Sequence, residues 1–211
     1  MLDLTLAMLV RNPPLERMAA LVEYMSVLAS EVIIIDTGST PEELETMASW
    51  NKHPFGLPKV SIIQRPWKDD FAWARNQALP FISRKWTIAL DPDELPSYEL
   101  MNFIKGVVTN DPGEQTAGYL VYTPDFYDGK RNPYYEFQWH VRLFRSGEGV
   151  WYRALDELVN LRGLGEHETR GTVLLPKAPA EATLIHSKGG VYIRQSRELY
   201  DRMHKEGKDQ L

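Results

Sequence analysis

Several features are absent from this 211-residue chain, and each absence excludes a class of protein. There is no cysteine, which excludes disulfides, thiolate metal sites and a cysteine nucleophile. No apolar run approaches the ~20 residues that cross a bilayer, so we expect no membrane span. Positive charge is not in excess either, because the formal net charge of -5 gives no clear footprint for a nucleic-acid backbone. We therefore expect a soluble, cytoplasmic protein.

The remaining composition suits a chain that folds around its own core. Hydrophobic residues make up 43% of the sequence, and we expect one domain over residues 1–211. Residues 4–10 are apolar but short, lack a basic leader and are followed by Arg-Asn-Pro-Pro rather than by a cleavage site. This segment therefore predicts a buried strand rather than a targeting signal.

The first half of the chain alternates between strand and helix patterns, which is typical of an α/β domain with a largely parallel sheet. Asn12 is predicted to cap a helix that begins at Pro13, and Thr40 to form a capping box with Glu43. Ser97 can cap a later helix in the same way. The expected strands span residues 4–10, 31–35, 60–63 and 86–90, and the expected helices include 13–25, a helix from 41, 71–79 and 98–108.

The second half has a different pattern. Residues 118–122 and 137–145 alternate like antiparallel strands, and aromatic residues become denser. We interpret these rings as core, with a cleft that stacks on a sugar or peptide as the alternative. The rings are Tyr127, Tyr134, Tyr135, Phe137, Trp139, Trp151 and Tyr152. Residues 192–208 predict a charged amphipathic helix, either a solvated face or a lid.

Acidic residues follow the predicted strands, at the edge where ligands bind in open α/β sheets. Asp36 follows the second strand, Asp70 the third, and Asp91 and Asp93 the fourth. Two carboxylates one residue apart repel each other unless a cation compensates them, and their hard oxygens suit Mg²⁺ or Mn²⁺ and hence phosphate. The alternative is an acidic turn without a ligand.

Two further polar residues have open interpretations. Asp36 suits a hydrogen bond to a nucleobase or a ribose hydroxyl, and an Asx-turn that starts the next loop is the alternative. Arg75 suits a diphosphate or a carboxylate at the same edge, and a surface ion pair is the alternative.

Four blocks of sequence together resemble the family 2 glycosyltransferases with the GT-A fold. They are residues 6–12, residues 31–40 ending in Asp-Thr-Gly-Ser-Thr, residues 67–76 with Asp-Asp-Phe-Ala-Trp-Ala-Arg-Asn, and residues 90–94, Leu-Asp-Pro-Asp-Glu. The likeness continues more weakly through residues 142–145, 155–158 and 184–186. It implies a GT-A type αβα sandwich, with a mostly parallel nucleotide-sugar-binding half in residues 1–110 and a mixed, antiparallel acceptor-side half in residues 111–211.

The resemblance also implies a function. We expect a metal-dependent hexosyltransferase that moves a hexose from a nucleoside diphosphate sugar, with a UDP-sugar favoured, to an acceptor nucleophile with inversion. Mn²⁺ or Mg²⁺ is the implied cofactor, and a protein or a glycan is among the candidate acceptors. By resemblance, Asp93 and His186 bind the metal, and Asp91 contacts the ribose or the metal. The implied substrate contacts are Asn12, Asp36, Asp70, Arg75 and Asp91, and Trp151 is a further candidate for substrate binding from the aromatic set above.

The chain departs from the family pattern at two places. Pro13 stands where an acidic residue is usual, and Asp156 precedes Glu157 where the family usually has histidine. We assign Glu157 as the base that takes the acceptor proton, with Asp156 as the alternative residue. The other interpretation of these two acids is a plain acidic turn. The other interpretations of the whole protein are a non-catalytic nucleotide- or sugar-binding module and a phosphotransferase of the haloacid dehalogenase type.

Overall fold

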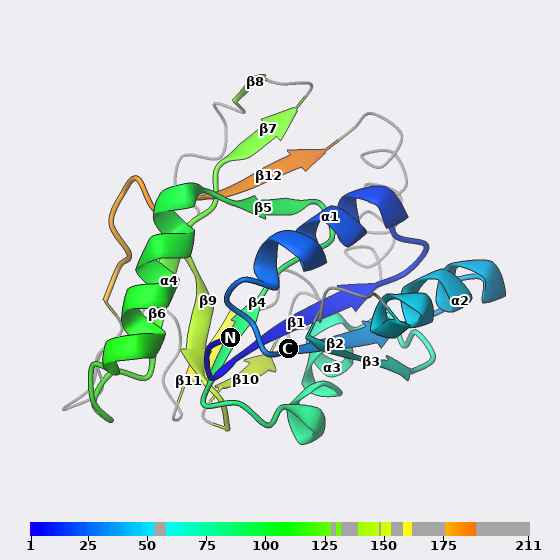
Figure 1. The fold of residues 1–211 in the computed structure, drawn as a ribbon, viewed down its shortest axis with the longest axis horizontal. Helices are drawn as coiled ribbons and strands as arrows, with labels where there is room; N and C mark the ends of the chain where they lie inside the picture. The colour runs from blue at the N-terminus through cyan, green and yellow to red at the C-terminus, as the bar shows by residue number, and fades with distance from the viewer. Residues whose placement is uncertain are drawn as a thin grey trace.

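A six-stranded sheet with the order β3-β2-β1-β4-β9-β6 forms the centre of the computed structural model (Figure 1). The structure describes residues 1–52, 58–127, 130–131, 139–147, 149–152, 158–161 and 176–188, some of them by their backbone alone. Strands β1 to β4 are parallel, β9 is antiparallel to β4, and β6 is antiparallel to β9. The strands are β1 Leu4–Val10, β2 Glu31–Asp36, β3 Lys59–Gln64, β4 Trp86–Ala89, β6 Gly118–Tyr122 and β9 Trp139–Arg145.

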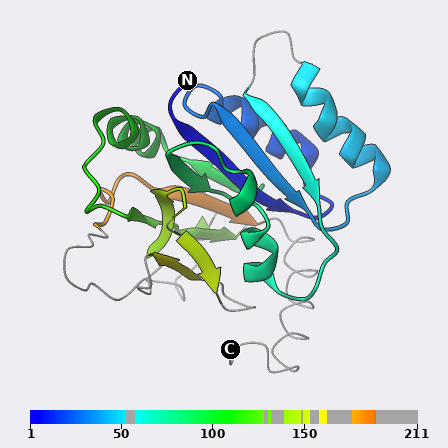
Figure 2. The same cartoon turned by 90° about the horizontal axis from the view of Figure 1, so that it is seen from below.

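Helices cover both faces of this sheet, and Figure 2 shows α1 and α3 on opposite sides of it. In β2, Val32 and Ile34 belong to the same core cluster as α1, whereas Ile33 and Ile35 pack with Ala78 beyond α3. This alternation buries β2 completely, as expected for a strand between two layers. The helices are α1 Leu15–Met25, α2 Pro41–Ser49, α3 Phe71–Asn76 and α4 Tyr98–Asn110, with 3-10 turns at Trp50–Lys52 and Leu79–Phe81.

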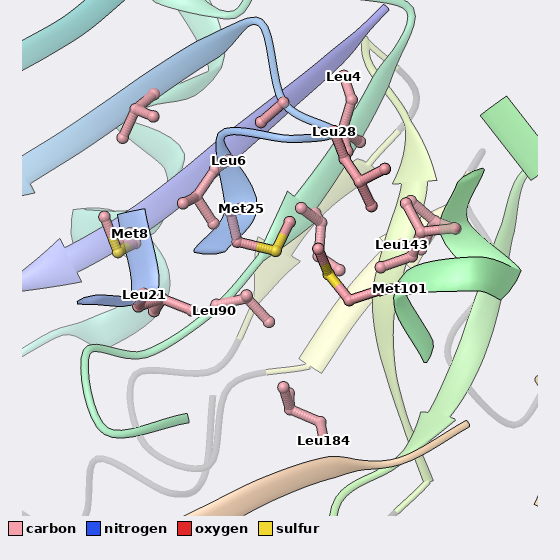
Figure 3. Close-up of a cluster of buried hydrophobic side chains, with 14 of the residues drawn as sticks. Leu4, Leu6, Met8, Leu21, Met25, Leu28, Leu90, Met101, Leu143 and Leu184 are labelled. Atoms are coloured by element: carbon pink, nitrogen blue, oxygen red, sulfur yellow. The ribbon is translucent and has the colours of Figure 1, made fainter. Parts of the chain in front are cut away.

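The larger core lies between the sheet and the layer that contains α1 and α4. Figure 3 shows side chains from β1, α1, α4 and β9 gathered in one cluster. The labelled members are Leu4, Leu6, Met8, Leu21, Met25, Leu28, Leu90, Met101, Leu143 and Leu184. Burying such side chains contributes about 2 kcal/mol each, so this contact fixes the sheet against its helices.

A smaller sheet with the order β5-β12-β7-β8 and a separate hairpin complete the described elements. The antiparallel pairing of β5 and β12 brings residues 94–96 beside residues 184–186. None of the helices in the described part of the chain has both the length and the apolar character of a membrane span. The remaining strands are β5 Glu94–Pro96, β7 Asp125–Tyr127, β8 Lys130–Arg131, β10 Gly149–Tyr152, β11 Leu158–Leu161 and β12 Leu184–Lys188.

Two predicted helix caps are confirmed. The Thr40 backbone N–H donates to Glu43 Oε2 at 2.7 Å and the Glu43 N–H donates to Thr40 Oγ1 at 3.3 Å, which is a complete capping box. The hydroxyl of Ser97 accepts from the Leu100 N–H at 3.1 Å at the start of α4.

Two predicted helix boundaries are wrong, and proline explains both. Helix α1 begins at Leu15 rather than Pro13, because each residue that precedes a proline is displaced from the helical region. Asn12 instead takes a left-handed φ of 46° and does not cap the helix. Helix α3 ends at Asn76 rather than at residue 79, since a helix continued to Pro80 would bring its ring against the Asn76 carbonyl.

Candidate functional site

The carboxyl edge of the parallel strands is the site that this topology offers. From β1, the chain places β2 on one side and β4 on the other, so the connections run in opposite directions at that point. Ligands of open α/β sheets bind at such a reversal. Val10 and Asp36 are register partners at the ends of β1 and β2, and Asp91 lies two residues beyond Ala89, the last residue of β4.

The Asp91 side chain is held by an arginine of α3, the helix on the sheet face opposite α1. Its Oδ1 accepts a hydrogen bond from Nη2 of Arg75 at 2.7 Å. The Arg75 side chain is 8% exposed and that of Asp91 is 27% exposed, so the pair is only partly open to water. Of the interpretations left open for Arg75, this structure shows the contact with an edge carboxylate.

Arg75 is placed there by a short helix that Asp70 starts. Oδ1 of Asp70 accepts from the Trp73 backbone N–H at 2.8 Å, which makes Asp70 the N-cap of α3. The predicted substrate residue Asp70 therefore has a structural contact in this structure.

The Asp91–Glu94 turn is closed by hydrogen bonds in both directions. The Glu94 N–H donates to the Asp91 carbonyl at 3.0 Å, and the Asp91 N–H donates to Glu94 Oε2 at 2.8 Å. Glu94 itself is buried, and Nη2 of Arg142 on β9 donates to its Oε1 at 2.6 Å. We assigned no role to Glu94 or Arg142 from the sequence. An acid three residues after Asp91 has the spacing of a capping box, and the only sequence signal at Arg142 is the weaker family likeness of residues 142–145.

The predicted metal ligands lie near one another in the backbone. Asp93 is half-buried within the turn, and His186 on β12 is the register partner of Glu94, the next residue. Among the side chains that the structure describes, no group of three or more histidines and acids could hold a metal. The side chain of His186 is outside that description, so its role as a ligand stays a prediction.

Asp36 and Asn12 meet at the ends of β1 and β2. The Asp36 carboxylate is buried and accepts from the backbone N–H of Gly38 at 3.3 Å and of Ser39 at 3.1 Å. Gly38 has a φ of +131°, which suits glycine alone at this turn. The Asn12 N–H donates to Ser39 Oγ at 3.0 Å. The Asx-turn alternative for Asp36 is thus present, whatever else its carboxylate binds.

Trp151 is part of the core in this structure. It is 5% exposed, and its ring lies edge-on to Phe144 with 5.3 Å between centroids. Asn76 donates to its carbonyl at 2.8 Å and accepts from its N–H at 2.9 Å. The structure therefore favours the core alternative over a substrate contact. Asp156 and Glu157, in the connection between β10 and β11, lie outside the described residues. The predicted helix at 192–208 lies outside them as well.

Comparisons with known proteins match this fold. A sequence model of glycosyl transferase family 2 matches residues 15–154. The SPbeta prophage-derived glycosyltransferase SunS of Bacillus subtilis (strain 168) is 30% identical over 70 residues, which are 33% of this chain and 15% of SunS.

Two solved structures are also similar. S. aureus TarS 1-349 in complex with UDP-GlcNAc has a TM-score of 0.57 at 10% identity, over 88% of this chain and 58% of that chain. The mannosyltransferase PcManGT from Pyrobaculum calidifontis in complex with GDP-Man and Mn²⁺ has a TM-score of 0.47 at 19% identity, over 58% of this chain and 36% of that one. This chain thus spans only part of each relative. The sheet topology and the likeness to TarS confirm the mixed α/β fold class with a mostly parallel sheet.

Proposed function

The chain belongs to glycosyltransferase family 2, and we propose that it transfers a hexose from a nucleoside diphosphate sugar to an acceptor nucleophile, with a divalent cation and with inversion. Membership of this family argues against a phosphotransferase of the haloacid dehalogenase type. A non-catalytic module of the same fold differs from the proposed enzyme in the donor-hydrolysis assay given below. We also propose that residues 1–110 bind the donor and residues 111–211 the acceptor, within one domain.

The observation that carries this proposal is the Arg75–Asp91 ion pair at the carboxyl edge of the sheet. A guanidinium and a turn with two aspartates lie together there, next to the strand reversal. Carboxylate oxygens suit Mn²⁺ or Mg²⁺, and a planar guanidinium suits phosphate oxygens. The donor set therefore fits a metal-bound diphosphate.

Each residue has a distinct role in the proposed transfer. A cation bound by Asp93 and His186, with Asp91 towards the ribose or the metal, would stabilise the negative charge of the departing diphosphate. Arg75 adds a second positive charge at the phosphates. Asp36, whose carboxylate can accept further hydrogen bonds, binds the nucleobase. Glu157, or Asp156 in its place, takes the proton of the attacking nucleophile.

We favour a UDP-sugar as the donor and a protein or a glycan as the acceptor. The similar TarS structure holds UDP-GlcNAc, which supports testing uridine donors first. GDP- and dTDP-sugars belong in the same panel, since the described residues do not distinguish the bases.

Asp93→Ala tests the metal assignment. We expect metal-dependent release of the nucleoside diphosphate to fall by about 100-fold or more, because a ligand of the cation is lost. The measurement is Mn²⁺-dependent donor hydrolysis across the sugar-nucleotide panel, with circular dichroism as the check on folding. Glu45→Gln, at an exposed position on α2, is the matched control. Undiminished release by Asp93→Ala would overturn the assignment.

A further inference from the structure

Glu94 is a buried charge at the junction of three strands. Its side chain has no exposed surface, and Arg142 compensates it with a hydrogen bond of 2.6 Å. A buried carboxylate is tolerated only with such partners, so both side chains are restricted to this arrangement. Glu94 begins β5, Arg142 comes from β9, and His186 of β12 is the register partner of Glu94.

The same carboxylate holds the backbone of the aspartate turn. Oε1 of Glu94 accepts from Arg142 while Oε2 accepts from the Asp91 N–H. The Glu94 N–H returns a bond to the Asp91 carbonyl. Asp91 therefore cannot rotate about its backbone without breaking contacts to a buried acid.

A break in the β6–β9 register accompanies the position of Arg142. Tyr119 pairs with Leu143 and Leu120 pairs with Val141, so the register steps over Arg142. Irregularities of this kind redirect a side chain out of the regular alternation of a strand. The guanidinium that reaches Glu94 comes from this irregular point.

We propose that Glu94 and Arg142 are positioning residues that fix the turn of Asp91 and Asp93 for the cation and the donor diphosphate. The proposal rests on the function proposed above. Neither residue needs to contact the ligand, because Glu94 acts through the Asp91 backbone and Arg142 acts through Glu94.

The charge of Arg142 and its positioning role predict opposite changes in Mn²⁺ affinity when Arg142 is replaced. Arg142 is a positive charge near a cation site, and Coulomb's law alone says that removing it strengthens Mn²⁺ binding. Positioning says that removing it weakens Mn²⁺ binding, since the turn loses its support. The sign of the change therefore distinguishes the two.

Arg142→Met and Arg142→Lys are the test variants, and Arg145→Met is the matched control. Arg145 lies on the same strand and also forms an ion pair, with Asp111 at the end of α4. Its register partner is Trp86 at the amino end of β4, away from the candidate site. Binding of Mn²⁺ alone is measured by calorimetry, and urea unfolding is measured in parallel. We expect the Mn²⁺ Kd to rise about tenfold in Arg142→Met and by a smaller factor in Arg142→Lys, as for other residues that support metal ligands. Arg145→Met should keep the Kd of the unsubstituted protein.

Arg142→Lys carries the test by itself if Arg142→Met does not fold. Lysine retains the charge, so an unchanged Kd in Arg142→Lys would overturn the positioning role. Unchanged or tighter binding by a folded Arg142→Met would do the same. If the unsubstituted protein bound no Mn²⁺, with or without UDP, the proposed function would be overturned instead.

Discussion

At the scale of single residues, the ion pair between Arg75 and Asp91 is the central contact of the candidate site. Each brings a charge to a partly buried position, and the two are 2.7 Å apart. An arginine in this position neutralises the carboxylate when no cation is bound, and it offers donors to phosphate when a nucleotide is bound. We therefore expect the arginine to affect metal and nucleotide binding in opposite directions.

Arg75→Met should separate these two effects. We expect the affinity for Mn²⁺ alone to rise about threefold to tenfold, because a competing positive charge is removed. The affinity for UDP should fall by about tenfold for loss of a charge-assisted contact. Calorimetry with Mn²⁺ and then with UDP measures both. Arg84→Met, which removes an exposed charge before the amino end of β4, should change neither. Weaker Mn²⁺ binding in Arg75→Met would contradict the argument.

At the scale of elements, Asn76 joins helix α3 to the hairpin of β10 and β11. Its side-chain amide bonds both the N–H and the carbonyl of Trp151, which are 75 residues away in the chain. Arg75 and Asn76 are neighbours on α3, so one helical turn contacts both the aspartate turn and the hairpin. Asp156 and Glu157 lie in the connection between the two strands of that hairpin.

Asn76→Ala should destabilise the protein more than the neighbouring substitution Gln77→Ala does. Two backbone groups of buried Trp151 lose their partners, and we expect the free energy of unfolding to fall by about 2–3 kcal/mol. Urea unfolding measures this change. Gln77→Ala, which removes side-chain bonds to Arg65 and to the Trp73 carbonyl, is the control and should cost under about 1 kcal/mol. Equal losses would show that the Asn76–Trp151 link contributes little.

At the scale of the whole molecule, the two edges of the sheet have different functions. The carboxyl edge holds the candidate site, whereas the opposite edge holds ion pairs that stabilise the fold. There, Asp111 at the end of α4 contacts both Lys85 and Arg145. Glu31 at the start of β2 accepts bonds from Thr5 and Ser83.

These acids make stability depend on pH. Hydrogen bonds from Arg145 and Lys85 hold the pKa of Asp111 well below its usual range. Burial by itself raises the pKa of Glu31, but the bonds from Ser83 and Thr5 outweigh burial and the net pKa is lowered. The unfolded chain therefore takes up these protons first, and the stabilisation present above about pH 5 is lost as the pH falls.

Urea unfolding between pH 7 and pH 3 should show this loss. Asp111→Asn should be less stable at pH 7 and should lose less stability on acidification, since one lowered pKa is removed. Glu99→Gln, at an exposed position on α4, should follow the unsubstituted protein. An unaltered pH dependence in Asp111→Asn would rule out its contribution.

Much of the local structure could be predicted from the sequence because its signals are local. The capping box at Thr40 needs only three neighbouring residues, and the continuous apolar run of β2 indicates burial on both faces. The predictions that were wrong involve prolines that act at a distance of a few residues. Pro14 delayed the start of α1, and Pro80 ended α3 four residues before itself.

The sequence by itself determined the α/β fold class and the positions of Asp36, Asp91 and Asp93 at strand ends, since strand periodicity and turn residues are properties of short segments. Asp36 has the local partners Gly38 and Ser39 that an Asx-turn predicts, and only the tertiary structure decided the distant partners of Asp91 and Glu94. Arg75 reaches Asp91 from the opposite layer, and Arg142 reaches Glu94 from 48 residues away. Such pairs arise when packing brings separate helices, strands and turns together, and no local pattern specifies them.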